Sequence, residues 1–187
     1  MIRSLAAGVV LSLIASAAMA APGAVTHTYG APEAPIASAV FAPAGVDTFY
    51  VSGTTSAPLT PAAAGVPATY GNTEQQTDSA LTRIEAILKA QGFGPGDVVK
   101  MTVYLVGDPA AGGKMDFAGM MAAYKRHYGT ADQPNRPART TVQVVLPAGD
   151  RGALVEVDVI AVRPKTGLAD SGTPRQRVSC LVALGVP

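Results

Sequence analysis

Apolar residues in this chain recur at two spacings, of which one is typical of strands and the other of helices. Runs of β-branched and aromatic residues predict strands over residues 36–41, 47–53, 97–106, 137–147 and 153–162. In the third of these runs, Val99 and Met101 begin an apolar set that alternates with polar residues. Because side chains alternate between the two faces of a strand, we expect this set to face the core.

Two helices are expected between these strands. The first has a capping box at residues 73–76, in which the Thr73 hydroxyl and a Gln side chain satisfy exposed backbone N–H groups, and it ends at Gly92. The second is capped by Asp116 and ends at Gly129. Apolar residues recur in both at three- and four-residue steps, typical of a core face: Leu81, Ile84, Ile87, Leu88, Phe117, Met120, Met121, Tyr124 and Tyr128.

The order of elements is strand, strand, helix, strand, helix, strand, strand. Short turns that contain Pro and Gly, at residues 43–45 and 147–152, predict a hairpin at each end of the patterned region. Helices placed between strands in this way predict an α+β fold, in which a mixed sheet carries both helices on one face. The other face then needs cover, and self-association would supply it.

The two ends of the chain lack this patterning. Arg3 and the apolar run that follows it up to Ala20 predict a secretory signal peptide over residues 1–20. The run is short for a membrane-spanning helix, so we expect export to the periplasm and no stable membrane anchor after cleavage. Residues 21–35, rich in Ala, Pro and Gly, indicate an extended lead-in, and residues 164–187, without periodicity, indicate a disordered tail.

Composition limits the chemistry that the chain can support. Of its 187 residues, 48% are hydrophobic and 14% are charged, which suits one domain with a substantial core. The formal net charge is +1 and Trp is absent, so no nucleic-acid partner is expected. Cys180 is the only cysteine, and the two histidines, His27 and His127, are far apart, so the sequence offers no metal-ligand spacing.

Charged residues stand at unusual places in the last two strands. Arg139 opens one run, and Glu156 and Asp158 share one face of the other, which is otherwise apolar. A guanidinium offers paired donors that match a carboxylate; the alternative is a structural arginine at a strand end or a subunit contact. Glu156 could pair with Arg139 or lie at a solvated end, but a buried charge without a partner is costly, which favours a paired or ligand-linked role. Asp158 is more simply structural.

Several motifs together carry a family resemblance over residues 36–163. They are Ser52-Gly53, the first helix with Gly92, residues 97–103, Phe117 and Tyr124, Pro137-Ala138-Arg139-Thr140, and residues 155–162. In this order they resemble the YjgF/RidA family of enamine/imine deaminases. The resemblance implies a chorismate-mutase-like fold assembled as a homotrimer, with an inner barrel of sheets and a ligand cleft at each subunit interface.

The resemblance also implies site residues. Arg139 corresponds to the arginine that grips the carboxylate of a small 2-imino acid, and Glu156 to the glutamate that positions or activates water. Backbone N–H groups near Gly53 and Thr141 would help to hold the carboxylate, and Thr54 stands where the family often has Gln. The family chemistry needs no metal and no organic cofactor, so none is expected here.

Besides Thr54, two positions and one segment depart from the family pattern. Met121 replaces an Asn of the second helix, Thr141 replaces a frequent Cys, and residues 34–38 replace a Gly-Pro-Tyr-Ser-like segment. The carboxylate-binding Arg139 and the acidic Glu156 are retained, while the polar groups around them change.

Two functions follow from these observations. The first is hydrolysis of 2-imino acids, of the 2-iminopropanoate or 2-iminobutanoate type, to 2-keto acids and ammonia. The alternative is a non-catalytic trimeric protein of the periplasm that binds a small carboxylate or acts as a holdase, because such imines arise mostly in the cytoplasm and hydrolyse quickly in water. Ribonuclease action appears in the family's naming, but the near-neutral charge argues against it.

Overall fold

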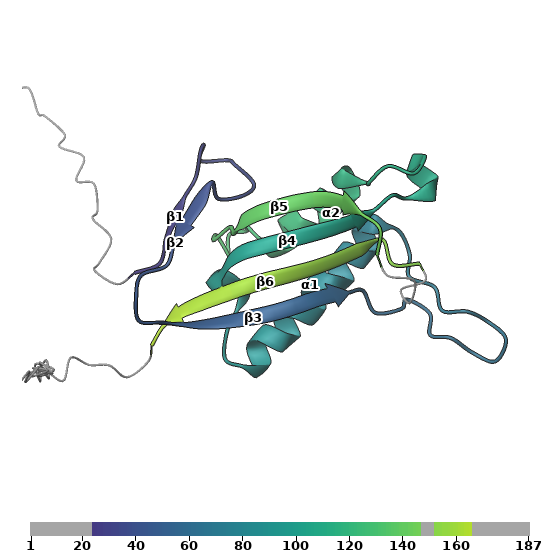
Figure 1. Ribbon diagram of the computed structural model, residues 1–187, viewed down its shortest axis with the longest axis horizontal. Helices are drawn as coiled ribbons and strands as arrows, with labels where there is room; N and C mark the ends of the chain where they lie inside the picture. Colours follow the sequence, from purple (N-terminus) through teal and green to yellow (C-terminus); the bar gives the residue numbers. More distant parts are fainter. Residues whose placement is uncertain (1–23, 147–151, 166–187) are drawn as a thin grey trace, which may run out of the picture.

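The computed structural model describes residues 24–146 and 152–165. Its strands are β1 (Thr26–Thr28), β2 (Ala39–Phe41), β3 (Val46–Thr55), β4 (Val98–Val106), β5 (Ala138–Val144) and β6 (Val155–Pro164). Its helices are α1 (Thr73–Ala90) and α2 (Phe117–His127), with short 3-10 turns η1 (Pro95–Asp97) and η2 (Pro109–Ala111). Four strands form a mixed sheet in the order β3-β6-β4-β5, and both helices lie behind it (Figure 1). The predicted α+β architecture is confirmed.

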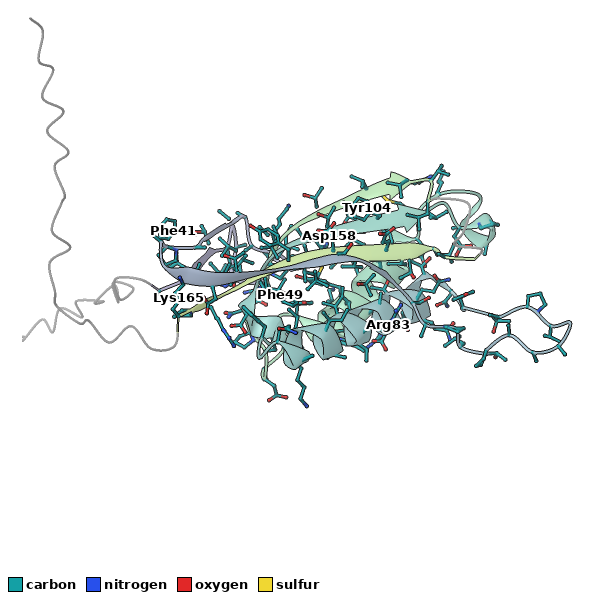
Figure 2. All side chains as sticks on the ribbon, turned by 60° about the horizontal axis from the view of Figure 1, so that its bottom comes forward. Phe41, Phe49, Arg83, Tyr104, Asp158 and Lys165 are labelled. Atoms are coloured by element: carbon teal, nitrogen blue, oxygen red, sulfur yellow. The ribbon has the colours of Figure 1, made fainter. Side chains whose placement is uncertain are left out.

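One face of this sheet packs on the helices and the other does not. Val155, Val157 and Val159 of β6 are buried against the apolar stripes of α1 and α2. Glu156 and Asp158 alternate with these valines and therefore point the other way, as do their register partners Tyr104 and Thr102 of β4. Figure 2 shows Tyr104 and Asp158 on this side. We call this second side of the sheet, away from the helices, the open face.

The predicted hairpins are wrong. β5 and β6 are not neighbours, because β4 lies between them; β5 pairs parallel with β4, whereas β6 runs antiparallel to β4 and β3. The reason is that α2 connects β4 to β5, and a crossover helix on one face returns the chain in the same direction. At the other end, β2 pairs with β1 and not with β3.

The segment before β2 is more structured than an extended lead-in. β1 lies within the predicted lead-in, and Ser38 donates a backbone hydrogen bond to Thr28 at 2.8 Å. Arg136 holds this segment to the domain, because its guanidinium lies 4.1 Å from the Tyr29 ring centroid and donates to the Pro32 carbonyl at 3.0 Å. The first predicted strand is correspondingly short, since Ala37 forms only a bridge with Ala138.

Two local predictions shift by one residue. The cap of α1 is Asn72, whose side chain accepts from the Gln75 N–H at 3.0 Å while Gln75 accepts from the Asn72 N–H at 3.1 Å. Thr73 is thus the first helical residue. In β4, a register shift between Val98 and Lys100 places Val98, and not Val99, in the core. The predicted cap of α2 is confirmed, since Asp116 accepts from the Gly119 N–H at 2.8 Å.

Several predictions fall on residues that the structure does not describe. The signal peptide over residues 1–20 and the tail from residue 166 onward lie outside the described residues, as does most of the predicted turn at 147–152. Among the helices that are described, none has the length and apolar character needed to span a membrane.

Candidate functional site

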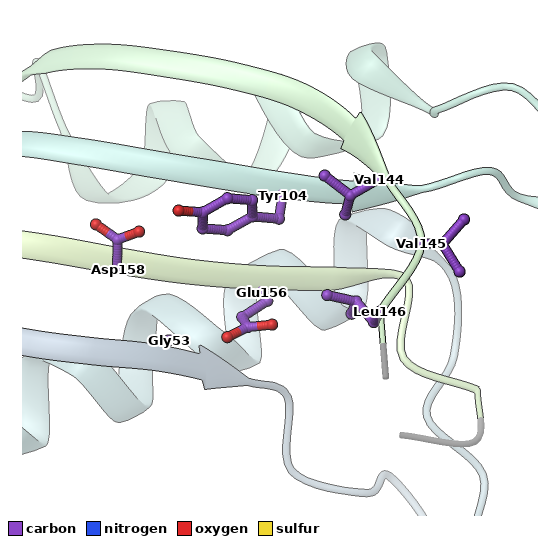
Figure 3. A pocket seen from close by; sticks show the side chains of 7 residues that line it. All are labelled: Gly53, Tyr104, Val144, Val145, Leu146, Glu156 and Asp158. Atoms are coloured by element: carbon purple, nitrogen blue, oxygen red, sulfur yellow. The ribbon is translucent and has the colours of Figure 1, made fainter. Parts of the chain in front are cut away.

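A cavity of about 310 Å³ opens on the open face of the sheet (Figure 3). β6 contributes Glu156 and Asp158, β4 contributes Tyr104, and β3 contributes Gly53. The end of β5 and the residues after it close one side with apolar groups, which are Val144, Val145 and Leu146. The cavity therefore has two carboxylates and a phenol on one wall and aliphatic side chains on the other.

Glu156 owes its position to an irregularity in β3. The register between β3 and β6 shifts between Val51 and Thr54, so Ser52 and Gly53 form a bulge. A Cβ atom built on Gly53 would lie only 1.7 Å from Oε1 of Glu156. The carboxylate can occupy this place only because residue 53 has no side chain. Thr54 is buried beside the bulge, and its hydroxyl donates to the Ser52 carbonyl at 3.0 Å.

Tyr104 lies beside the second carboxylate. It pairs with Glu156 in the β4–β6 register, one step from the pair of Thr102 and Asp158. Interaction with the Asp158 carboxylate raises the pKa of the Tyr104 hydroxyl, so the phenol is protonated at neutral pH. Among the described residues, no cation forms an ion pair with Glu156 or Asp158. Glu156 is thus left facing the cavity as an acceptor.

Arg139 lies on the other side of the sheet. It pairs in register with Met101, which is buried in the core, so its side chain runs beneath α2. Its guanidinium lies 4.3 Å from the ring centroid of Tyr124 and 5.9 Å from that of Phe117. Nη2 donates to the sulfur of Met121 at 3.0 Å. Aromatic faces and a thioether therefore hold this cation, and neither supplies a counter-charge.

The surroundings leave Arg139 with unused donor capacity. Burial lowers the pKa of its guanidinium, which stays charged at neutral pH because arginine titrates far above that range. Burial also raises the pKa of Tyr124 to about 12, so the phenol beneath it is neutral. Within the described part of the chain, Nη1 of Arg139 and the hydroxyl of Thr141 are buried without a hydrogen-bond partner. These are two donors on one face of one strand for which the described chain supplies no acceptor.

Residues 31–163 match the protein family described as Endoribonuclease L-PSP. The chain belongs to this family. It is the YjgF/RidA family that the sequence motifs indicated.

Three relatives illustrate the similarity of this L-PSP family member. A RutC family protein of Haemophilus influenzae is 34% identical over 106 residues, covering 57% of this chain and 73% of the relative. Protein DfrA of Myxococcus xanthus is 36% identical over 139 residues, covering 73% and 92%. TdcF of Escherichia coli, whose name proposes a reactive intermediate deaminase, is 32% identical over 107 residues, covering 57% and 73%. The crystal structure of TdcF with bound serine aligns at 26% identity and a TM-score of 0.46, over 74% of this chain and 99% of that one.

The predicted site residues of this family member fall into two groups. Gly53 and Glu156 meet on the open face, whereas Arg139 and Thr141 lie under α2. One chain therefore does not bring the guanidinium to the carboxylate. Thr54 supports the bulge and is absent from the cavity lining.

Sequence reasoning missed two parts of these groups. It favoured a packing role for Tyr104 and a structural role for Asp158, although both line the cavity. Alternation along each strand gives the face on which Tyr104 or Asp158 lies. The two residues come together only because β4 pairs with β6, and the sequence carries no signal for that pairing. The contact of Met121 with Arg139 likewise depends on how α2 lies on β5.

Proposed function

We propose that this protein is a Rid-type deaminase that hydrolyses small 2-imino acids to 2-keto acids and ammonia. The observation that supports it best is the carboxylate of Glu156, which has no cationic partner in the described chain and lines an open cavity of about 310 Å³. Membership of the family and the deaminase name of the TdcF relative point to the same chemistry.

The proposed reaction needs one base and one carboxylate anchor. Glu156 accepts a proton from water as the water oxygen attacks the imine carbon, which gives a carbinolamine. That proton moves on to the imine nitrogen, which completes the carbinolamine. A second transfer through Glu156, from the carbinolamine hydroxyl to the amino nitrogen, forms the C=O bond as the C–N bond breaks, and the products are a 2-keto acid and ammonia. Asp158 and Tyr104 line the same wall, and Glu156 is the carboxylate that lies against the bulge at Gly53.

The anchor is proposed to come from a second copy of the chain. Arg139 and Glu156 of one chain lie on opposite faces of the sheet, so one ligand reaches both only if another chain supplies the guanidinium. The open face and its rim expose large apolar side chains, with Tyr50 73% and Val145 94% accessible, and association would cover them. A closed homotrimer with three such contacts is the assembly that we propose.

Turnover by the mature protein tests the proposal. Freshly generated 2-iminobutanoate is supplied, and release of 2-oxobutanoate and ammonia is compared with the uncatalysed rate. We expect acceleration that Glu156→Gln and Arg139→Ala each abolish and that Glu33→Gln, at an exposed position outside the cavity lining, leaves unchanged. A rate equal to the uncatalysed one contradicts the proposal.

Mixing the two inactive variants tests the two-copy site separately. If random assembly pairs an intact Arg139 with an intact Glu156 in one site out of four, co-refolded Arg139→Ala and Glu156→Gln chains recover about a quarter of the wild-type rate. No recovery, or activity in a protein that light scattering shows to be monomeric, contradicts a site shared between copies.

One observation favours the second candidate, a non-catalytic carboxylate-binding protein. Nη1 of Arg139 and the Thr141 hydroxyl are buried donors without a partner in the described chain, and a carboxylate that reached them would need no help from Glu156. Binding of 2-oxobutanoate measured by calorimetry, lost in Arg139→Ala and kept in Glu156→Gln, together with no imine turnover, would support this candidate over the enzyme. In either case, export to the periplasm is proposed from the sequence of residues 1–20 alone, and cell fractionation tests it.

A further inference from the structure

Met121 stands apart from the other methionines of the described chain. Its sulfur accepts a hydrogen bond from Nη2 of Arg139 at 3.0 Å. Its side chain is half-buried, whereas Met101 and Met120 are fully buried. Met115 is also half-buried, and both Met115 and Met121 pack against the core cluster, so the contact with Arg139 is what distinguishes Met121 from Met115. A small oxidant can therefore reach Met121 more easily than Met101 or Met120.

We propose that Met121 is an oxidation site, and that the oxygen of its sulfoxide accepts hydrogen bonds from the Arg139 guanidinium. In this step, the sulfur lone pair attacks one oxygen of hydrogen peroxide and the O–O bond breaks. That oxygen stays on sulfur, which is oxidised by two electrons, and the other oxygen leaves as water after taking up the remaining proton. The N–H groups of Arg139 lie beside the reacting sulfur and can stabilise the negative charge that develops on the leaving oxygen.

The Met121 sulfoxide changes the hydrogen bonds that Arg139 can donate to a ligand. A thioether is a weak acceptor, whereas a sulfoxide oxygen is a strong one, so it competes for the guanidinium donors. Nη1 of Arg139, which has no partner in the described chain, is the donor next to the one that already contacts the sulfur. Engagement of both leaves fewer donors for a carboxylate. This consequence rests on the proposed function of Arg139, while the oxidation itself does not.

The tryptic peptide of residues 115–125 contains Met115, Met120 and Met121, so fragment spectra of one peptide rank all three in the same sample. The folded, full mature protein is treated with hydrogen peroxide and sampled over time. We expect sulfoxide at Met121 first and at Met120 last. Equal rates at Met120 and Met121, or faster oxidation of Met115 than of Met121, overturn the proposal.

Two readouts test the effect on Arg139. Peroxide treatment should weaken 2-oxobutanoate binding about tenfold in the wild type, and methionine sulfoxide reductase should restore it. The variant Met121→Leu, which conserves volume, should lose no affinity on the same treatment. Equal losses of 2-oxobutanoate affinity in the wild type and in Met121→Leu contradict the inference that Met121 oxidation blocks Arg139.

The second readout separates this inference from the proposed function. Phenylglyoxal modifies accessible guanidinium groups, and mapping by mass spectrometry gives the modified fraction at Arg139. Oxidation should lower that fraction in the wild type and leave it unchanged in Met121→Leu. If the untreated protein binds no 2-oxobutanoate, the proposed function fails, but a drop in Arg139 modification still supports the inference and an unchanged fraction overturns it.

Discussion

A Cβ atom on Gly53 would lie 1.7 Å from Oε1 and 2.7 Å from Cδ of Glu156, so the carboxylate rests where any other residue would place its side chain. The β-bulge at Ser52 and Gly53 brings the backbone of β3 to this place, and Thr54 secures the bulge by its bond to Ser52. Backbone geometry and the acid thus depend on each other.

The first prediction concerns Gly53→Ala. The added methyl must displace the Glu156 carboxylate, so imine turnover should fall by about 10- to 100-fold. Because the displaced atoms belong to the end of a flexible side chain, the free energy of unfolding should change by less than about 1 kcal/mol. Gly94→Ala is the matched control, since a Cβ there meets nothing within 4 Å. Full activity in Gly53→Ala would mean that the position of Glu156 is unimportant.

Gln76 connects α1 to the start of β6. It is fully buried; its Nε2 donates to the carbonyls of Gly71 and Gly152 at 3.0 and 2.9 Å, and its Oε1 accepts from the Leu154 N–H at 2.8 Å. One amide therefore satisfies three backbone groups on two segments that are distant in sequence.

The second prediction is that Gln76→Leu destabilises the fold by about 3 kcal/mol, because it leaves buried backbone groups without partners. Urea unfolding followed by circular dichroism measures this. Gln75→Ala, which removes half of an exposed capping box, should cost only about 1 kcal/mol and serves as the control. If both variants lose the same small amount, water replaces the amide and the three bonds contribute little.

The third prediction distinguishes the two candidate caps of α1. Asn72→Ala should cost about 1 kcal/mol, because the Gln75 N–H loses its acceptor. Thr73→Val should cost nothing or be stabilising, since the Thr73 hydroxyl is buried and has no partner among the described residues. Asn72→Ser should retain most of the stability. A larger loss from Thr73→Val than from Asn72→Ala would restore Thr73 as the cap.

An ion-pair cluster joins α1 and α2. His127 lies between Glu85 and Asp78, with Nδ1 at 2.6 Å from Oε1 of Glu85 and Nε2 at 3.1 Å from Oδ1 of Asp78. Arg126 contacts Asp78 at 3.0 Å and Glu74 at 2.7 Å. Burial opposes ionisation of Asp78, but hydrogen bonds from His127 and Arg126 outweigh it, and the pKa of Asp78 is lowered below its ordinary value of 3.8.

The fourth prediction follows from the sign of this shift. A carboxyl whose pKa is lower in the folded state stabilises the fold above its unfolded pKa, and this contribution is lost as the pH falls through the folded value. Asp78→Asn should therefore cost about 0.5–1 kcal/mol near neutral pH, since the pair is largely exposed, and progressively less below pH 3.8. Urea unfolding across this range, with the exposed Asp132→Asn as control, measures the difference. A cost that does not shrink in acid contradicts the coupling.

Local elements could be read from the sequence because neighbouring residues specify them. Leu81, Ile84 and Leu88 are buried as predicted, and Asp116 caps α2. Ile87 and Phe117, which were predicted on the same core faces, are exposed. Errors were of one residue where two neighbouring residues could each cap a helix, as with Asn72 and Thr73 at the start of α1. They were large where distant segments had to choose partners, since β6 enters between β3 and β4 and does not pair with β5.

The sequence by itself determined the family, the two helices on a mixed sheet, and the identity of an arginine and a glutamate that differ from their apolar surroundings. It could do so because periodicity and motif order are local properties of the chain. Only the tertiary structure decided which side of the sheet each of these groups occupies. Register and strand order set that side, and a parallel β5 directs Arg139 under α2 while an antiparallel β6 directs Glu156 to the open face.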